Sequence, residues 1–451
     1  MKISFLDDEP EIFPTQYGGK ARTIMTLAGR FVKRKDVEQV NILSRSINDA
    51  RKKIIWNEIN LFKLDSYDMV KRIVDEASDV DILNVHASSF TFPRLRTKKA
   101  KIINHMHDVI FATCDAGSHL DKAIGGYWDA IVTPSPFASR TLKNVAPWKS
   151  SETPIYTIQR AIDGETFKKI EKREAYKKIT RLNGSLKNVS ARYPVIFFPH
   201  RVNAGKGEIL LPKIYKKLKE EYPNCLVITT FKTQEGPGFE DFINVGWIKT
   251  IDMKYFYSIS DLTVSLSFLP ESFSQVCLES VSCGTPVVCL RFGNLSTLSL
   301  EFPAIQSCKP EIEDISSNII KLLKDSKKTA LNITASKKIL KEKYSPTTVV
   351  KEYIRVYEEL LSNTVKLDEY VLNDEFQFFT SPLIADHGQT VYLYENGQLN
   401  KYIVSDTESC ILHICLESKT LKELQNTLKI EQEKIKKSLK KLIDERLIIR
   451  S

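Results

Sequence analysis

The chain has 451 residues, of which 42% are hydrophobic and 27% are charged, and its formal net charge is +10. This length exceeds the size at which one hydrophobic core stops growing, so we expect two or three domains, and the composition excludes collagen-like, low-complexity and disordered classes. The positive charge favours an anionic partner, and its sign leaves nucleotide phosphate, nucleic acid and a lipid surface open.

The sequence predicts a cytoplasmic protein without a membrane span. Its longest apolar runs, such as residues 193–198 and 287–290, are far shorter than the roughly 20 residues needed to cross a bilayer. Residues 1–8 suit a first strand better than a signal peptide. The eight cysteines include no CxxC pair, which argues against a disulfide framework and a structural zinc site.

Two stretches of the chain alternate short apolar strands with amphipathic segments, which predicts two α/β domains with parallel sheets. In the first stretch we expect helices at 23–33 and 67–77. Strands are expected in the first stretch at 3–6, 40–43, 82–85, 102–105 and 130–133, and in the second at 195–198, 225–229, 262–265 and 287–290. The lysine-rich segment 168–192 between them predicts a linker with an exposed helix.

The amino-acid pattern changes again near residue 366, which predicts the start of a third region. Segments 389–394 and 399–404 flank Glu395-Asn396-Gly397, which predicts a hairpin. Helices are expected at 420–428 and 432–445, the second with Ile435, Leu439 and Leu442 on one face. This order predicts a small α+β winged-helix-like domain.

The most informative stretch is residues 270–288. Ser274 can cap a helix, Gly284 can end it, and the helix N-terminus offers N–H groups to an anion. Glu279 lies among apolar residues of this helix and needs a partner, which sugar hydroxyls can supply. The alternative is that Glu271 caps the helix and Glu279 meets an arginine.

The spacing from Glu271 to Glu279, followed by Ser-Cys-Gly-Thr-Pro-Val-Val, resembles the EX7E signature of the family-four retaining glycosyltransferases. The resemblance implies that Glu271 contacts the donor sugar and Glu279 the ribose. Upstream, residues 198–207 resemble the family's Gly-Arg-Leu-x-x-x-Lys-Gly element, which assigns Arg201 and Lys206 to the donor diphosphate. Fixed cations can stabilise such a leaving group without a metal.

Other segments match this family more loosely. Gly18 and Gly19 resemble its glycine-rich loop, His107 aligns with its His-Asp element with His105 as the alternative, and Trp247 fits its turn near the base while also suiting a plain core position. Arg160-Ala161 replaces the family's usual Asn-Gly before Asp163.

The family's Glu-Gly-Phe-Gly is here Glu271-Ser272-Phe273-Ser274. The backbone donors survive, so Phe273, Ser274 and Gln275 stay candidate donor-binding residues, but the added serines leave the sugar preference open. The pair Asp79 and Asp81 precedes a strand, the wrong end of a parallel sheet for a metal-binding DxD, and is expected to be a loop. We expect no metal and no cofactor besides the nucleotide-sugar co-substrate.

Residues from about 375 to 451 resemble, in the order of their elements, PqqD-like peptide-recognition domains. Such domains bind a leader peptide as an added strand, which implies a peptide acceptor. A glycan is the other expected acceptor. The alternative role of this domain is packing or dimerisation. The basic run of Lys434, Lys436, Lys437, Lys440 and Lys441 also allows nucleic acid binding, but nearby acidic residues and missing aromatics argue against it.

The resemblance implies a GT-B fold with two Rossmann-like domains facing a cleft. The expected boundaries are 1–167 with a returning helix at 345–362 for the acceptor domain, 168–344 for the nucleotide-sugar domain and 366–451 for the accessory domain. Expected partners are a nucleotide-sugar donor, the acceptor, a leader peptide and, transiently, a membrane surface. Two alternatives stay open: glycan synthesis for the cell envelope or secondary metabolism, and a non-catalytic binding protein. The sequence leaves the oligomeric state open.

Overall fold

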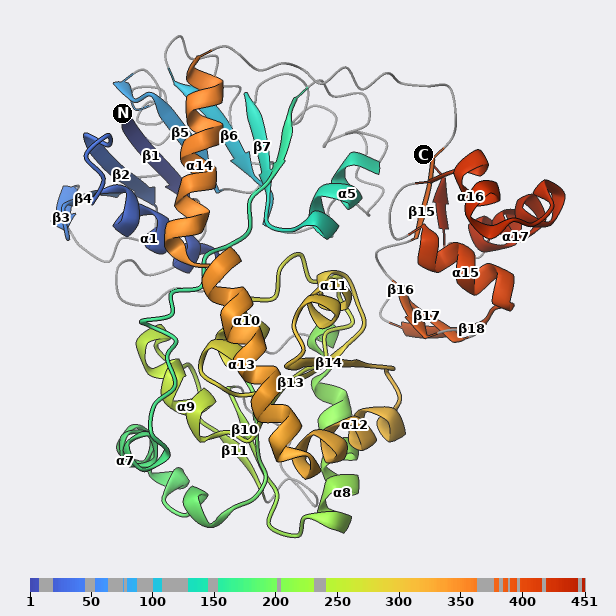
Figure 1. The fold of residues 1–451 in the computed structure, drawn as a ribbon. Helices are drawn as coiled ribbons and strands as arrows, with labels where there is room; N and C mark the ends of the chain where they lie inside the picture. The colour runs from blue at the N-terminus through green and yellow to red at the C-terminus, as the bar shows by residue number, and fades with distance from the viewer. Residues whose placement is uncertain are drawn as a thin grey trace. The chain divides into compact units, whose positions relative to one another are not determined.

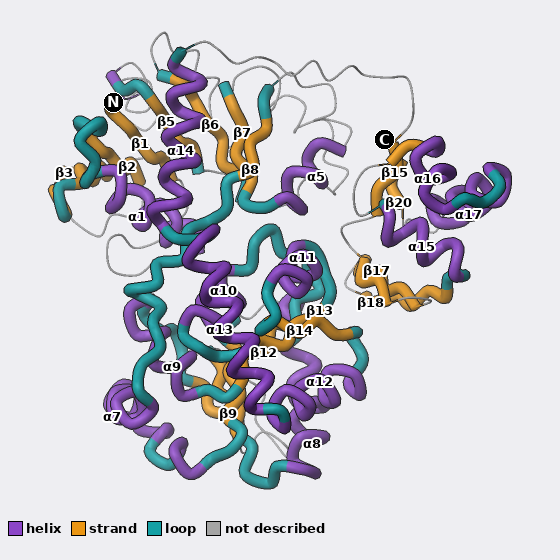
Figure 2. Tube along the Cα trace, viewed as in Figure 1, coloured by secondary structure: helices purple, strands orange, loops and turns teal. Residues whose placement is uncertain are grey.

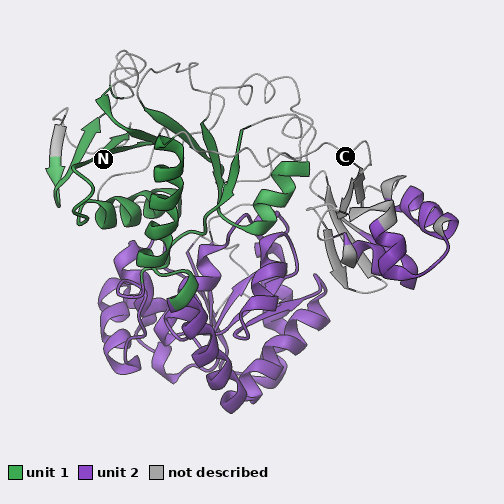
Figure 3. Ribbon diagram, turned by 45° about the horizontal axis from the view of Figure 1, so that its top comes forward, with its two compact units in different colours: residues 1–163, 342–372 green, residues 164–341, 373–451 purple. Residues whose placement is uncertain are grey.

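The computed structural model describes sixteen segments of the chain, which are residues 1–7, 19–44, 53–63, 76, 79–86, 100–107, 129–144, 153–200, 204–230, 241–362, 377–380, 384–387, 390–395, 398–415, 419–444 and 448–450. They belong to two compact units (Figure 3). Unit 1 comprises Met1–Asp163 and Glu342–Leu372, and unit 2 comprises Gly164–Lys341 and Asn373–Ser451. Figures 1 and 2 show the elements of both units.

Unit 1 is built on an eight-stranded sheet with the order β3-β4-β2-β1-β5-β6-β7-β8. Neighbouring strands are parallel except for β3 and β4, which form an antiparallel pair at one edge that the sequence did not predict. The strand order reverses between β1 and β5. The strands are β1 Lys2–Asp7, β2 Gln39–Ser44, β3 Lys53–Trp56, β4 Ile59–Lys63, β5 Ile82–Val85, β6 Lys101–His105, β7 Ala130–Thr133 and β8 Ile155–Thr157.

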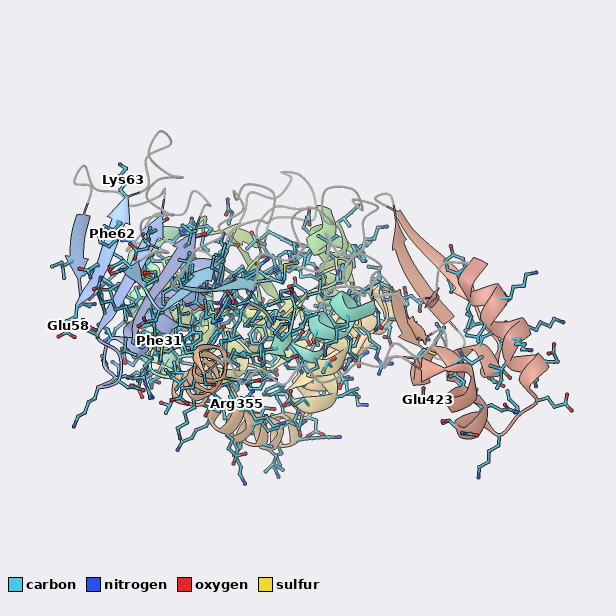
Figure 4. All side chains as sticks on the ribbon, turned by 90° about the horizontal axis from the view of Figure 1, so that it is seen from above. Phe31, Glu58, Phe62, Lys63, Arg355 and Glu423 are labelled. Carbon is cyan, nitrogen blue, oxygen red and sulfur yellow. The ribbon has the colours of Figure 1, made fainter. Side chains whose placement is uncertain are left out.

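The helices described in unit 1 are α1 Gly19–Phe31, α5 Pro136–Asn144 and α14 Pro346–Leu361. The apolar faces of α1 and α14 share one core with β1, although they are far apart in the sequence. Phe31 of α1 stacks on Tyr357 of α14 with ring centroids 5.7 Å apart, while Arg355 is exposed beside Glu359 (Figure 4 labels Phe31 and Arg355). The predicted helix at 67–77 lies outside the described residues except for Glu76.

Unit 2 is built on a six-stranded, entirely parallel sheet with the order β11-β10-β9-β12-β13-β14. This is the strand order of a dinucleotide-binding sheet, and it reverses between β9 and β12. The strands are β9 Val195–Phe198, β10 Leu226–Thr229, β11 Phe242–Asn244, β12 Leu262–Ser265, β13 Val287–Leu290 and β14 Ile305–Cys308. All four strands predicted for this domain are present.

Both faces of the unit-2 sheet bury apolar clusters. The helices are α7 Lys172–Leu182, α8 Leu211–Glu221, α9 Met253–Ile259, α10 Gln275–Ser282, α11 Asn294–Glu301, α12 Ile312–Lys324 and α13 Ser326–Lys343. Short 3-10 helices lie at η1 Gly184–Leu186, η2 Val189–Ala191, η3 Ala204–Lys206, η4 Glu208–Leu210 and η5 Thr250–Asp252.

The helix predicted in the segment 168–192 is present as α7, but the segment is not merely a linker, because one face of this helix is buried. Ala175 and Ile179 of α7 are fully buried in the core that also contains Val195 and Phe197. The segment has few apolar residues, but this pair is spaced by four and therefore lies on one helix face. Composition alone missed the pattern because lysines cover the other faces.

The C-terminal elements form two three-stranded sheets, with the orders β19-β15-β20 and β16-β17-β18, and three helices. The predicted hairpin is present, since Glu395 pairs with Gln398 across the β17–β18 ladder. The elements are β15 Gln377–Thr380, β16 Ile384–His387, β17 Thr390–Glu395, β18 Gln398–Ile403, α15 Asp406–Ile414, β19 Lys419–Thr420, α16 Leu421–Leu428, α17 Gln432–Asp444 and β20 Ile448–Arg450.

Local chemistry explains two of these helices. At α15 the Ser405 hydroxyl accepts from the Glu408 N–H at 3.3 Å and the Glu408 carboxylate accepts from the Ser405 N–H at 2.8 Å, which is a capping box. In α17, Ile435, Leu439 and Leu442 are buried in one cluster, as predicted. The separation of this region as a third domain stays a prediction.

Two further properties bear on partners. Among the described residues, no helix is both long enough and apolar enough to cross a membrane. The basic run of α17 is exposed, and Lys436 and Lys441 pair with Glu433 at 3.0 Å and Glu408 at 2.9 Å. These pairs reduce the positive charge that the run presents.

Candidate functional site

The carboxyl ends of β9 and β12 are neighbours at the point where the strand order of the unit-2 sheet reverses. Parallel α/β sheets bind ligands at this point, because the loops that follow the two strands diverge there. The loop after β9 carries His200 and Lys206, and the loop after β12 carries Glu271. Arg201, predicted to hold the diphosphate, lies outside the described residues.

Backbone contacts hold these two loops together. The carbonyl oxygen of Gly205 accepts hydrogen bonds from the N–H groups of Phe268 at 2.8 Å and Leu269 at 3.3 Å. Gly207 has a φ of +76°, and a Cβ atom there would overlap the carbonyl oxygen of Leu266. Glycine is therefore required for the close approach that brings Lys206 to the loop after β12.

Lys206 and Glu271 form an ion pair in which Nζ lies 2.5 Å from Oε1. Burial by itself raises the pKa of Glu271, but the neighbouring Lys206 ammonium outweighs it and holds this pKa below its usual value. The carboxylate is therefore ionised at neutral pH. The pair presents one fixed cation and one strong hydrogen-bond acceptor at the switch point of the sheet.

His200 supports this pair and was not identified as a site residue from the sequence. Its ring is buried edge-on against Phe198, with centroids 4.8 Å apart. Burial, and next the Lys206 charge, lower the pKa of His200 to about 4, although Glu271 acts in the opposite direction. The ring is therefore neutral at physiological pH and adds no charge beside Lys206.

Glu279 lies inside α10 with only 1% of its surface exposed. The hydroxyl of Tyr257 donates to its Oε2 at 3.1 Å. The carboxylate thus has a tyrosine hydroxyl as a hydrogen-bond partner inside the helix. Glu271 does not cap the helix either, because it pairs with Lys206 and the N-cap position belongs to Ser274.

Ser274 occupies the N-cap position in a left-handed conformation, with a φ of +65°. Its hydroxyl donates to Sγ of Cys277 at 3.3 Å and makes no hydrogen bond to the helix backbone, so the predicted side-chain cap is wrong. The other end follows the prediction. Gly284 at a φ of +82° donates to the Val281 carbonyl at 2.9 Å, and Thr285 donates to that of Ser280 at 3.0 Å, which is a Schellman motif.

The other predicted donor-binding residues of unit 2 differ in exposure. The Phe273 ring is buried, and its carbonyl accepts from Nδ2 of Asn294 at 3.0 Å, which fixes the loop before α10. Gln275, the first residue of α10, is also buried. Trp247 is 54% exposed in the segment after β11, at the same carboxyl edge of the sheet. Its ring is therefore accessible, unlike that of a core tryptophan.

In unit 1, His107 follows β6 at the carboxyl edge of the sheet. Its Nδ1 lies 2.7 Å from Nη2 of Arg160, and its Nε2 lies 2.8 Å from Nδ1 of His86. Both ring nitrogens are therefore engaged, so a ligand contact through the ring requires one of these bonds to open. The sequence missed Arg160 and His86, whose only signal was the departure from Asn-Gly at 160–161.

The alternative residue, His105, is part of the interior. Its Nε2 lies 2.9 Å from Oδ1 of Asn84, its Nδ1 lies 3.4 Å from the Tyr353 hydroxyl, and its ring stacks on His86 with centroids 3.9 Å apart. Burial lowers the pKa of His105 to about 3. This ring is a structural contact between β6 and α14.

The remaining predictions concern the start of α1 and the Asp79–Asp81 segment. Gly19 is the first residue of α1, next to Lys20, whose Nζ lies 2.6 Å from Oδ1 of the buried Asp7; Gly18 lies outside the described residues. Asp81 lies in a bend before β5 and accepts from the N–H of Lys2 at 2.8 Å at the amino end of the sheet, whereas Asp79, expected in the same loop, is helical. Over the described part of the chain, no cluster of His, Cys, Asp and Glu suits a metal ion.

Comparison with known proteins supports a GT-B glycosyltransferase. A family model described as "Glycosyl transferases group 1" matches residues 238–338, which include Glu271 and Glu279. A search of curated protein sequences gave no significant match.

Solved structures show the fold. Sucrose-phosphate synthase from Thermosynechococcus elongatus is similar with a TM-score of 0.65 and 14% identity over 80% of this chain and 100% of that chain. HepE from Anabaena, in complex with UDP, has a TM-score of 0.60 and 16% identity over the same shares. A glycosyltransferase from Rickettsia africae has a TM-score of 0.62 and 18% identity, over 80% of this chain and 99% of that one. The fold of this chain is therefore GT-B.

Proposed function

We propose that this protein is a retaining glycosyltransferase that moves a sugar from a nucleoside diphosphate sugar to an acceptor. The observation that carries the proposal is the Lys206–Glu271 ion pair at the switch point of the unit-2 sheet. The match of residues 238–338 to a glycosyltransferase family and the complexes of HepE with UDP and with UDP-glucose support it. The donor binds at this edge of unit 2, and the acceptor binds in unit 1.

In the reaction, the bond between the anomeric carbon and the diphosphate oxygen breaks, and the acceptor oxygen bonds to that carbon on the same face. The acceptor proton passes to the leaving diphosphate. Lys206, together with Arg201, stabilises the negative charge that develops on the leaving group, so no metal is needed. A cation already held in place by Glu271 requires little rearrangement during the reaction.

The two glutamates hold hydroxyl groups of the donor. Glu271 binds the sugar and Glu279 binds the ribose, because an ionised carboxylate accepts hydrogen bonds from two neighbouring hydroxyls. Trp247 flanks the base, and the backbone at Phe273, Ser274 and Gln275 contributes N–H donors. In unit 1, Gly18 and Gly19 approach the phosphates and His107 contacts the sugar or the acceptor.

The C-terminal region binds the acceptor when the acceptor is a ribosomally made peptide. Among the strands that the structure describes, β18 is an edge of the sheet β16-β17-β18, and its Ile403 is 65% exposed. An exposed strand edge can accept a peptide as a further strand. If the region only packs or dimerises, the acceptor is a glycan recognised by unit 1 alone.

The donor site is tested by thermal unfolding with a panel of nucleotide sugars that includes UDP-glucose. A donor at about 100 times its dissociation constant should add about 2.7 kcal/mol to the free energy of unfolding. We expect Glu279→Gln, which keeps the buried volume, and Glu279→Ala to remove most of this shift. Glu220→Ala, at an exposed position of α8, should leave it unchanged. A folded wild-type protein that no donor stabilises would contradict the proposal.

The peptide role needs a separate experiment. A displayed library of random peptides is selected on the full-length protein and on Ile403→Asp, which places a charge at the exposed edge. We expect enriched peptides to bind the wild-type protein and to lose binding to Ile403→Asp, while Lys440→Asp on the outer face of α17 keeps it. Enriched peptides that bind all three proteins equally would exclude this edge as the binding site.

A further inference from the structure

A chain of side-chain hydrogen bonds runs along the carboxyl edge of the unit-1 sheet, from Arg160 through His107 to His86. Nη2 of Arg160 lies 2.7 Å from Nδ1 of His107, and Nε2 of His107 lies 2.8 Å from Nδ1 of His86. The sugar-transfer chemistry proposed above uses neither Arg160 nor His86. Arg160 cannot accept a hydrogen bond, and this fixes which atom donates at each step of the chain.

A guanidinium offers only N–H donors, so Nδ1 of His107 accepts from Arg160 and carries no proton. Burial, and next the Arg160 charge, hold the pKa of His107 well below its usual value, so the ring is neutral with its proton on Nε2. That proton is donated to Nδ1 of His86. Burial also lowers the pKa of His86, whose neutral ring must then carry its own proton on Nε2.

The Nε2–H group of His86 is the free end of this chain. His86 is 1% exposed, and no atom of the described residues accepts a hydrogen bond from its Nε2. An unsatisfied buried donor costs about 1–3 kcal/mol, and native proteins pair the great majority of such groups. His86 directly follows β5, beside the point where the strand order of unit 1 reverses. A ligand atom is therefore the expected partner.

The charges around the chain indicate what kind of atom this is. Lys20 and Arg160 both act electrostatically on His86, and Asp7 is the described carboxylate that pairs with Lys20, at 2.6 Å. Lys20 also lies in the first turn of α1, a 13-residue helix whose N-terminus carries positive partial charge. The charges of Lys20 and Arg160 and the N-terminus of α1 therefore favour a negatively charged oxygen as the partner of this donor.

We infer that unit 1 binds an anionic oxygen, of a phosphate or a carboxylate, on the Nε2–H group of His86, and that Arg160 is the positioning residue that orients this donor. The oxygen can belong to the donor diphosphate or to an acidic group of the acceptor, since both present the same chemistry. The inference requires an oxygen ligand and does not require sugar transfer.

The binding site is tested by calorimetric titration of UDP, and of inorganic phosphate in the presence of saturating UDP. His86→Phe keeps the ring shape without the donor, whereas His86→Gln can still accept from His107 and donate to a ligand. We expect His86→Phe to weaken one of the two ligands about tenfold and His86→Gln to recover most of the affinity. Loss for UDP assigns the oxygen to the donor diphosphate, and loss for phosphate alone assigns it to an acidic acceptor.

Equal affinities of the three proteins for both ligands would overturn the inference, as would a folded wild-type protein that binds neither ligand. A different result is expected if the proposed donor site in unit 2 is wrong while this inference is right. In that case the wild-type protein binds phosphate without UDP, in a manner that depends on His86 and not on Lys206 or Glu279.

The positioning role is tested by nitrogen NMR of protein labelled at its seven histidines, assigned by single His→Gln variants. In the wild-type protein we expect the proton on Nε2 in both His86 and His107. Arg160→Met should allow the proton of His107 to occupy either ring nitrogen. It should also weaken binding of the same ligand that His86→Phe affects. Arg160→Lys should preserve it, because Nη2 alone makes the described contacts with His107. A wild-type His86 protonated on Nδ1 would contradict the role.

Discussion

The sheets of the two units carry different kinds of side chain at their carboxyl edges, where the candidate ligand-binding residues lie. At the carboxyl edge of unit 2, Lys206 and Glu271 form a partly accessible ion pair. At the corresponding edge of unit 1, His86 and His107 are neutral, and a hydrogen-bond chain orders them. A group that stabilises a leaving diphosphate must carry charge, whereas a group that orients an oxygen needs a defined donor. Similar topologies thus provide two different kinds of ligand contact.

Removing the positive charge of Lys206 from the unit-2 site should have the largest effect, and it should appear in the transfer rate. We expect Lys206→Ala to lower the transfer rate by about 10²–10³-fold, the range found when one preorganised electrostatic donor is removed. The rate is measured as the nucleoside diphosphate released from the donor that stabilises the protein. Lys213→Ala, an exposed lysine of α8, is the control. A rate within about twofold of the wild type would show that Arg201 alone suffices.

Low pH should destabilise unit 1 more than unit 2. The unfolded-state pKa of a histidine is near 6.5, and burial lowers the folded-state pKa of His105 to about 3 and of His200 to about 4, with His86 and His107 also well below 6.5. The unfolded chain then binds more protons than the folded one, so the free energy of unfolding falls as pH drops below 6.5.

Each such histidine contributes at most about 1.4 kcal/mol per pH unit. Unit 1 holds three of them and unit 2 holds His200, so hydrogen exchange between pH 6.5 and 4.5 should increase first in β1, β5 and β6. The carboxylate of Glu271, whose pKa is lowered, begins to lose its stabilising contribution only at the lower end of this window, as pH approaches the pKa of an unfolded glutamate. Equal acceleration of exchange in both sheets would show that the histidines of unit 1 are protonated at little cost.

The smallest expected effect lies in the loop before α10. Ser274 holds a φ of +65°, which costs a residue other than glycine about 1–2 kcal/mol, so Ser274→Gly should raise the free energy of unfolding by about 0.5–1 kcal/mol. Ser272 has no such φ, and Ser272→Gly should lower the same quantity by about as much. Urea unfolding measures both. A loss of stability in Ser274→Gly would show that the bond to Cys277 outweighs the strain.

Much of the fold could be predicted because local patterns decided it. The strand at 195–198, the helix ended by Gly284 and the buried face of Ile435, Leu439 and Leu442 each depend on residues close in sequence. The roles of Lys206, Glu271 and Glu279 came from the resemblance of their motifs to a glycosyltransferase family, and these roles stay predictions. Ser274 occupies the predicted N-cap position, but the predicted side-chain cap is missing, because its hydroxyl donates to the Cys277 thiol and its backbone is left-handed.

The sequence by itself determined the alternation of strands and helices, and therefore the sheet edges at which ligand-binding residues gather. Only the tertiary structure decided their partners, because Lys206 and Glu271 are 65 positions apart and Arg160 and His107 are 53 apart. Contacts over such separations depend on strand order, and strand order depends on how whole elements bury their apolar faces. The protonation order of the histidines likewise arose only when folding placed a guanidinium against one ring nitrogen.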